Sequence, residues 1–124
     1  MNTHASTEFQ NDYLSTWTEP DPDRRRRMIE KVWASDGELV ISSLGVTLHG
    51  TADIAAHITG VHDDMIAAKR LTFSYDQQLA AGDAVLLRWS MTSPSGDIIG
   101  RGIDLVFHNA AGQLAKAYMF MGVN

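Results

Sequence analysis

Asp104 stands in the middle of an apolar segment, where a carboxylate is costly to bury. The segment, Gly-Arg-Gly-Ile-Asp-Leu-Val-Phe-His over residues 100–108, is typical of a β-strand. Because side chains alternate along a strand, Gly100 and Gly102 share one face with Asp104. A carboxylate buried on that face needs a hydrogen-bonding partner or a proton. Asp104 is therefore our first candidate catalytic residue, and a purely structural acid is the alternative.

Two histidines add groups that titrate near neutral pH. His57 lies beside the apolar stripe of a predicted helix, and His49 precedes that helix. Either imidazole could take up or release a proton, and a surface position is the alternative for both. His57 and His62 are five residues apart, so they do not stack on one helical face as a pair of metal ligands would. The chain also has no cysteine, so we expect no metal site, no disulfide and no thiol nucleophile.

Large aromatic side chains recur at helical spacing near the start of the chain. Phe9, Tyr13 and Trp17 follow one another at intervals of four residues, so they form one stripe. The stripe is either part of a core or the wall of a cavity, and the Tyr13 hydroxyl could face either. The same two alternatives, core residue or wall of a substrate-binding cavity, apply to five further or overlapping positions, namely Trp17, Trp33, Trp89, Met91 and Met121.

Three helices and a series of strands must position these groups. The periodicity predicts helices over residues 6–18, 22–35 and 51–67. It predicts strands over residues 38–45, 71–76, 85–91, 100–108 and 114–121. Pro20 ends the first helix, and Pro22 suits the first position of the second. Helices followed by antiparallel hairpins favour an α+β fold, in which the helices cover the inner face of the sheet.

The composition limits the class of protein and its partners. A chain of 124 residues is the length of one domain, 1–124. A composition with 44% hydrophobic and 20% charged residues is typical of a soluble globular protein. The net charge of −5 argues against nucleic acid as a partner. We expect the four arginines at 24–27 to form a solvated helix face. The N-terminus is unlike a signal peptide and no window could span a bilayer, so we expect a cytoplasmic protein without membrane contact.

The order of elements, with several short motifs, resembles the NTF2-like superfamily and its SnoaL-like and ketosteroid isomerase-like branch. The motifs are Tyr13, Trp33-Ala34-Ser35-Asp36, the glycines Gly45 and Gly50, and the stretch 102–114 with Gly-Ile-Asp-Leu-Val and Ala-Gly-Gln-Leu. The resemblance implies a cone-shaped fold, with three N-terminal helices packed on a strongly curved antiparallel sheet around an apolar pocket. It also implies a homodimer formed through the outer sheet face, where Leu86, Leu105 and Phe107 would lie.

The resemblance assigns roles to part of a catalytic site. Ketosteroid isomerase-like enzymes use a tyrosine and a protonated aspartic acid as donors to an enolate, with a second aspartate as base. Tyr13 falls on the tyrosine position and Asp104 on the protonated acid. Ser42 occupies the neighbourhood of the base, and a serine cannot take a proton from carbon as a carboxylate would.

A histidine could supply the missing base. Scytalone dehydratase-like members of the fold use histidine in acid–base chemistry, so the resemblance allows His57 or His49 in that role. Ser42 would then contact the substrate rather than remove its proton. Gly102, which has no side chain, would leave room for the substrate beside Asp104.

These residues support one main hypothesis and two alternatives. The main hypothesis is a cofactor-free isomerase, cyclase or dehydratase that acts on an apolar carbonyl compound of polyketide or steroid type. The first alternative is a non-catalytic module that binds a hydrophobic ligand or dimerises. The second is an epoxide hydrolase, which in limonene epoxide hydrolase-like proteins needs an Arg-x-Asp pair and another acid. The corresponding positions here are Arg88, Ser90 and Tyr118, so that site is incomplete.

Overall fold

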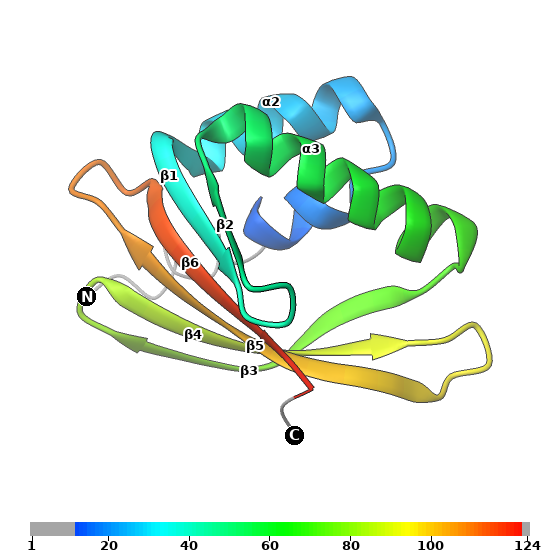
Figure 1. Ribbon diagram of the computed structural model, residues 1–124. Coiled ribbons are helices and arrows are strands. Elements are labelled where there is room, and N and C mark those ends of the chain that lie inside the picture. The colour runs from blue at the N-terminus through cyan, green and yellow to red at the C-terminus, as the bar shows by residue number, and fades with distance from the viewer. Residues whose placement is uncertain (1–11, 123–124) are drawn as a thin grey trace.

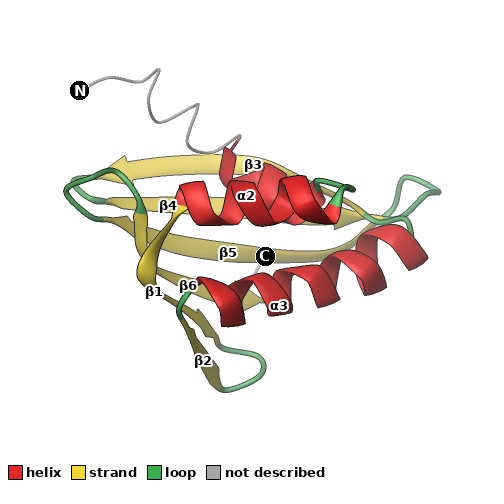
Figure 2. Cartoon of the chain, turned by 90° about the horizontal axis from the view of Figure 1, so that it is seen from above, coloured by secondary structure: helices red, strands yellow, loops and turns green. Residues whose placement is uncertain are grey.

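The structure is a computed structural model that describes residues 12–122. Residues 12–18 are helical, and the earlier part of the helix predicted over 6–18 lies outside the described residues. The elements that follow are α2 (Pro22–Val32), β1 (Trp33–Ile41), β2 (Val46–His49), α3 (Thr51–Val61), the π-helix η1 (His62–Ala68), β3 (Thr72–Ala81), β4 (Ala84–Thr92), β5 (Ile98–His108) and β6 (Leu114–Met121). The helices lie on the concave face of a curved sheet (Figure 1), and both α2 and α3 lie over it in roughly the direction of β3, β4 and β5 (Figure 2).

The strands form one six-stranded sheet in the order β2-β1-β6-β5-β4-β3. Four consecutive pairs, β1–β2, β3–β4, β4–β5 and β5–β6, are antiparallel, whereas β1 pairs with β6 in parallel. The sheet is therefore mixed, whereas we expected an antiparallel one. A short turn motif predicts that the two strands it joins are antiparallel. It does not predict the relative orientation of two paired strands that are far apart in the sequence. The α+β class is confirmed.

The second helix begins where its capping residues predict and ends early. Asp21 is its N-cap, and a carboxylate oxygen of Asp21 accepts a hydrogen bond from the backbone N–H of Arg24 at 3.0 Å. The helix stops at Val32 rather than at residue 35, because Trp33 adopts an extended conformation and pairs with Leu114 in the sheet. The first strand consequently starts earlier than residue 38, and a turn at residues 42–45 separates it from β2.

One arginine of the 24–27 run is buried, contrary to the expected solvated face. Arg25 is 2% exposed, whereas the three arginines beside it are exposed. Its guanidinium group donates to the backbone oxygen of Glu19 at 2.7 Å and approaches the hydroxyl of Thr59 on α3 at 3.5 Å. Arg25 therefore ties α2 to α3 above the sheet.

The long third helix changes character along its length. Gly50, with a φ of 85°, is the N-cap of α3, and no side-chain hydrogen bond caps the helix. Ile54 and Ile58 are fully buried against the core. From His62 onward the helix becomes a π-helix, a wider form that often lies beside functional sites.

The main core fills the space between the concave sheet face and the helices. It combines Tyr13 and Trp17 of the first helix with apolar residues of α2, α3 and the central strands, and a second cluster contains Leu71, Trp89 and Met91. Trp33 is fully buried in the main core, and its ring lies 6.5 Å from that of Tyr13, centroid to centroid. In the part of the chain that the structure describes, no helix is both long and apolar enough to cross a bilayer.

Candidate active site

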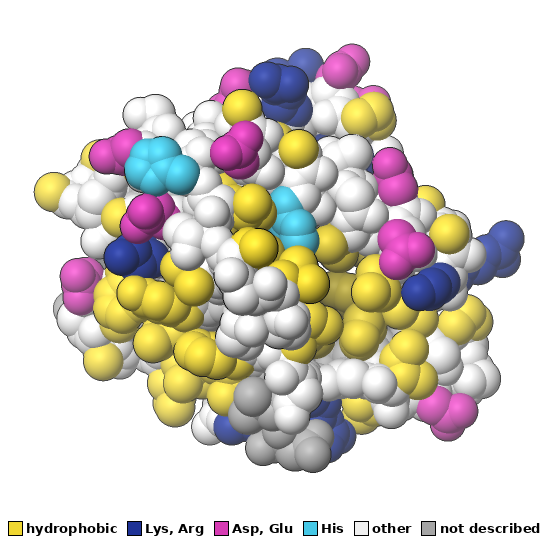
Figure 3. Space-filling view, viewed as in Figure 1, with side chains coloured by type: hydrophobic (Ala, Val, Ile, Leu, Met, Phe, Trp, Pro, Cys, Tyr) yellow, Lys and Arg dark blue, Asp and Glu magenta, His cyan; other side chains and the backbone are white. Residues whose placement is uncertain are grey.

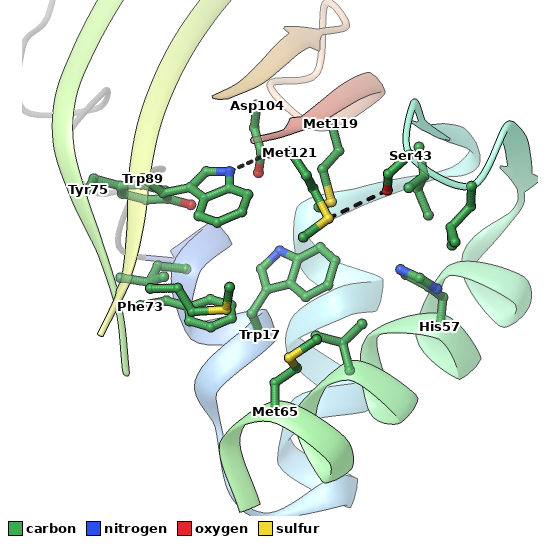
Figure 4. A pocket seen from close by; sticks show the side chains of 15 residues that line it. Trp17, Ser43, His57, Met65, Phe73, Tyr75, Trp89, Asp104, Met119 and Met121 are labelled. Carbon is green, nitrogen blue, oxygen red and sulfur yellow. Dashed lines mark hydrogen bonds between the residues drawn. The ribbon is translucent and has the colours of Figure 1, made fainter. Parts of the chain in front are cut away.

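A cavity of about 210 Å³ lies between the concave sheet face, the first helix and the α3–η1 segment. Its walls are almost entirely apolar, and hydrophobic side chains gather around a hollow on the face shown in Figure 3. Figure 4 shows the cavity with its lining residues. Six of the residues singled out in the sequence line it, namely Trp17, His57, Trp89, Met91, Asp104 and Met121.

Asp104 is the carboxylate of this cavity. It is 3% exposed, and it lies on β5 between Leu87 of β4 and Met119 of β6. Its Oδ1 accepts a hydrogen bond from the Trp89 indole N–H at 2.9 Å, and its Oδ2 accepts one from the Tyr13 hydroxyl at 3.0 Å. Burial raises the pKa of Asp104 to about 6, although both hydrogen bonds act to lower it. The carboxyl group is therefore mainly ionised at pH 7.

These contacts favour a different role for Asp104 from the one that the resemblance implied. A neutral acid that donates a hydrogen bond must be protonated, which a pKa of about 6 allows only in mildly acidic solution. The Trp89 N–H and the Tyr13 O–H both stabilise the ionised form. At neutral pH the arrangement is suited to accept a proton, so Asp104 itself can fill the role of base.

Tyr13 acts on Asp104 rather than on the cavity directly. Its side chain is fully buried and is not among the groups that line the cavity. Burial and the nearby Asp104 charge raise the pKa of the Tyr13 hydroxyl well above its usual value, so the phenol stays protonated. Tyr13 is therefore a positioning residue for the carboxylate in this structure.

Gly102 makes room for Trp89 rather than for a ligand. The two residues are opposite each other in the β4–β5 pair, and a Cβ atom at Gly102 would collide with the indole ring. The indole also stacks on Phe73, with ring centroids 5.9 Å apart and planes 6° apart. This packing fixes the ring so that its N–H meets Asp104. The space that we expected Gly102 to leave beside the acid is occupied.

The two candidate histidines lie in different places. His57 projects from α3 into the cavity, half-buried, and its ring meets the Trp17 ring edge-on with centroids 6.1 Å apart. Burial lowers the pKa of His57, so its imidazole is neutral at pH 7. His49 is exposed outside the cavity, and its Nδ1 lies 3.3 Å from the Glu38 carboxylate. The structure therefore brings His57 to the site and leaves His49 out of it.

Two of the expected substrate-binding residues also lie outside the cavity. Trp33 is buried in the main core, because β1 begins there and turns the indole away from the cavity walls. Ser42 is exposed in the β1–β2 turn. The neighbouring Ser43 lines the cavity instead, and its hydroxyl lies 3.5 Å from the sulfur of Met121.

The positions considered for epoxide hydrolysis do not line the cavity either. Arg88 and Ser90 alternate with Trp89 along β4, so they lie on the opposite face of the sheet. The Ser90 hydroxyl donates to Asp76 at 3.0 Å. Tyr118 pairs with Leu105 on that same outer face. No acid replaces these residues at the cavity wall on β4.

The cavity has lining residues that the sequence reasoning did not single out, including Leu14, Met65, Phe73, Tyr75 and Met119. Phe73 and Tyr75 lie opposite Met91 and Trp89 in the β3–β4 pair, so their alternation along β3 was the signal that could have identified them. Burial and the nearby Asp104 charge raise the pKa of Tyr75 well above its usual value. Within residues 12–122, no group of three or more His, Asp or Glu side chains could hold a metal ion.

Solved structures with the same fold include proteins named for isomerase and cyclase activity. One is a candidate isomerase of the SnoaL-like family from Agrobacterium tumefaciens str. C58, with 24% identity, coverage of 94% of this chain and 97% of that one, and a TM-score of 0.83. A candidate SnoaL-like polyketide cyclase from Jannaschia sp. CCS1 has 17% identity, 93% and 85% coverage, and a TM-score of 0.71. A protein with a ketosteroid isomerase-like fold from Catenulispora acidiphila DSM 44928, in complex with trimethylamine, has 15% identity, 91% and 84% coverage, and a TM-score of 0.72.

No protein-family model matches the sequence, and no curated protein matches it. At these identities the solved structures establish the fold. The chain therefore has the NTF2-like fold that SnoaL-like and ketosteroid isomerase-like proteins share.

Proposed function

We propose that the protein is a small-molecule enzyme of the isomerase or cyclase class that transfers a proton at a carbon next to a carbonyl group. The observation that carries the proposal is the buried Asp104 carboxylate at the wall of an apolar cavity, held by two hydrogen-bond donors and with a pKa of about 6. A base whose pKa lies close to the working pH combines ionisation with affinity for a proton. The named activities of proteins with this fold support the same class.

The reaction begins when an Asp104 oxygen takes the proton from the α-carbon. The electron pair of the broken C–H bond forms a C=C bond, and the carbonyl π electrons move to oxygen, which gives an enolate. In an isomerase, Asp104 then returns the proton to a different carbon. In a cyclase, the enolate carbon forms a bond to a second carbonyl carbon, and the resulting alkoxide receives the proton. No cofactor is needed for either sequence.

His57 is the second group that can exchange protons in the cavity. Its neutral imidazole can both donate and accept a hydrogen bond, and it enters the cavity from α3 rather than from the sheet. A substrate between Asp104 and His57 would therefore have a proton-transfer group on each side. His57 is suited to the second carbonyl of a cyclising substrate.

The cavity limits the size of the enclosed part of the substrate. An apolar protein cavity of about 150 Å³ holds one benzene molecule, and pockets for larger ligands begin at about 300 Å³. The cavity here, about 210 Å³, fits one ring with small substituents. Leu44 and Met121 are exposed apolar residues of its wall, so further apolar parts of a longer substrate can rest at the mouth. A polyketide-like or steroid-like compound would place one end in the cavity and the rest at its mouth.

Deuterium uptake tests the proposal without knowledge of the natural substrate. Monocyclic enones and 1,3-diketones in D₂O should exchange their α-protons faster with the protein, as measured by proton NMR. We expect Asp104→Asn to lower the enzymatic rate by about a hundredfold or more, because a general base contributes at least that factor. Tyr13→Phe should retain exchange and move the acidic limb of the rate profile to higher pH. The Tyr13 hydrogen bond lowers the pKa of Asp104, so the pKa rises when that bond is removed.

His49→Gln is the matched control, because His49 is exposed and outside the cavity. It should exchange protons as fast as the unchanged protein. An Asp104→Asn variant that exchanges at the original rate would refute the proposed base. Ketones that bind without any deuterium uptake would favour the hydrophobic-ligand-binding module instead, a function that the nearly apolar cavity wall also suits.

A further inference from the structure

The indole nitrogen of Trp17 is a buried donor that finds no acceptor within residues 12–122. The side chain is 4% exposed, its Nε1 makes no hydrogen bond to that part of the chain, and the residue lines the cavity. More than nine-tenths of buried polar groups in proteins have a partner, so an unpaired donor at a cavity wall points to a ligand acceptor. An indole N–H can only donate, which means that the partner must be an acceptor such as a carbonyl oxygen.

The Trp17 nitrogen lies on the same side of the cavity as the carboxylate. Figure 4 shows the indole between Trp89 and His57, with its nitrogen turned toward the part of the site that contains Asp104. The N–H also lies near the Tyr13 oxygen, where it acts to lower the pKa of that phenol without the geometry of a hydrogen bond, and the Tyr13 hydroxyl is 3.0 Å from Asp104. A substrate that presents its α-carbon to Asp104 can therefore present its carbonyl oxygen to Trp17.

The other polar groups of the cavity are less suited to this role. The Trp89 N–H already donates to Asp104, and the Ser43 hydroxyl lies at the exposed rim beside the Met121 sulfur. The His57 imidazole enters the cavity from α3 rather than from the sheet, and the proposed function assigns it to a second carbonyl. The Tyr75 hydroxyl is the remaining competitor. Tyr75 also borders a second, more open hollow beside β3, where solvent can satisfy a hydroxyl without any ligand. Trp17 has no such access.

We propose that the Trp17 indole N–H donates a hydrogen bond to the carbonyl oxygen of the substrate and stabilises the enolate that forms there. This inference rests on the proposed function. As Asp104 takes the α-proton, negative charge develops on the oxygen, and the N–H···O hydrogen bond becomes stronger in the apolar surroundings. Trp17 is thus a catalytic residue, whereas the sequence offered only a core residue or an apolar cavity wall at that position.

Two methylated benzenes of similar shape test the donor without turnover. 4-Methylphenol presents an oxygen that resembles an enolate oxygen, and p-xylene has a methyl group in its place. The three tryptophans give three indole N–H signals in a proton–nitrogen NMR spectrum, and Trp17→Phe and Trp33→Phe identify two of them. We expect 4-methylphenol to move the chemical shift of the Trp17 indole proton downfield. We expect p-xylene to cause no such downfield shift.

Equal responses of the Trp17 signal to the two compounds would overturn the proposal, and so would the absence of binding by both. A downfield response at Trp89 alone would also overturn it. The NMR result does not depend on catalysis. A Trp17 response without deuterium uptake by any ketone would refute the proposed function and leave Trp17 as a hydrogen-bond donor to ligands. Deuterium uptake without a Trp17 response would support the proposed function and refute the role of Trp17.

Paired variants measure the contribution of the donor. Trp17→Phe should lower the affinity ratio of 4-methylphenol to p-xylene about tenfold, the usual value of one hydrogen bond. Trp33→Phe is the matched control, because Trp33 also has a buried, unpaired Nε1 but does not line the cavity. It should leave the ratio unchanged. A ratio that falls in Tyr75→Phe and not in Trp17→Phe would assign the donor to Tyr75 and overturn the proposal.

Discussion

At the residue scale, Asp104 is subject to two opposing effects. Burial favours the neutral acid, while the hydrogen bonds from Tyr13 and Trp89 favour the carboxylate. The result is a pKa of about 6, well above the ordinary value of 3.8 and still below neutral pH. An acid of this kind is ionised in neutral solution and nevertheless binds a proton more strongly than a carboxylate in water does.

The raised pKa of Asp104 predicts that the folded protein loses stability as the pH rises from about 4 to about 6. In that range the folded state keeps a proton that the unfolded state has released, so the free energy of unfolding falls with pH. The full loss from Asp104 is about 3 kcal/mol, because one pKa unit corresponds to about 1.4 kcal/mol. Urea unfolding of the unchanged protein and of Asp104→Asn at several pH values measures the effect.

The difference between the two proteins isolates Asp104 from the other titrating groups. The lowered pKa of His57, for example, acts in the opposite direction, since stability from that group is lost as the pH falls. This contribution is present in both proteins and cancels. Asp104→Asn should gain stability relative to the unchanged protein as the pH rises. A constant difference between pH 4 and pH 7 would contradict the assigned pKa.

At the element scale, the register of β4 against β5 builds the site. It places Trp89 opposite Gly102, and the absence of a side chain at Gly102 lets the indole lie flat enough to reach Asp104 two residues further along β5. The same arrangement recurs two pairs along the strands, where a Cβ atom at Gly100 would lie 2.7 Å from the Met91 methyl group. The two glycines therefore shape the cavity wall through their neighbours on β4.

Gly102→Ala should destabilise the protein and disturb the site, because the new methyl group meets both the Trp89 ring and the backbone oxygen of Phe120. Overpacking of this kind costs about 1–3 kcal/mol. Loss of the Trp89 hydrogen bond should also raise the pKa of Asp104 further. Thermal or urea unfolding measures the first effect, and the pH profile of deuterium uptake measures the second.

Gly60→Ala is the control for that substitution. Gly60 lies inside α3, and a Cβ atom there would meet nothing within 4 Å. Alanine in an open helical position should stabilise the protein by about 0.5–1 kcal/mol. Equal stability of the Gly102→Ala variant and the unchanged protein would show that the contact with Trp89 does not constrain the sheet.

At the scale of the whole molecule, the curved sheet has one face toward the helices, and none of residues 12–122 forms a layer over the other face. Leu86, Leu105 and Phe107 lie on the uncovered face, and Phe107 meets the ring of Tyr118 edge-on at 6.1 Å. Figure 1 shows the helices gathered on the concave side alone. Apolar side chains on the other side are a suitable surface for a second copy of the chain.

We predict a homodimer formed through this outer face. Sedimentation velocity at micromolar concentration should give the mass of two chains, and Leu105→Glu should shift the protein toward one chain, because a buried unpaired charge opposes association. Leu44→Glu adds the same charge at the cavity mouth and should leave the dimer intact. A monomer of the unchanged protein at these concentrations would contradict the prediction.

Local patterns were sufficient for the parts of the fold that depend on near neighbours. Alternation along the strand placed Gly100 and Gly102 on the same face as Asp104, and helical spacing placed Tyr13 and Trp17 on one stripe of the first helix. Such periods follow from backbone geometry within one element, so a sequence carries them directly. The α+β class followed from the same patterns.

Other features depend on segments that meet only in the folded chain. The parallel pairing of β1 with β6 ended α2 at Val32 and drew Trp33 into the core, and packing against α3 buried Arg25. No local pattern contains these contacts, because their partners lie far away in the sequence.

The chemistry of the site also depends on segments that meet only in the folded chain. The sequence by itself determined that an acid, a tyrosine and several aromatic side chains face inward. Only the tertiary structure decided that Tyr13 and Trp89 donate to Asp104 and that His57 rather than His49 enters the cavity. It also left the Trp17 N–H without an acceptor among the described residues. Burial and hydrogen bonding set the pKa of a carboxyl group, and both are sums over contacts from the first helix, β4 and β5 together.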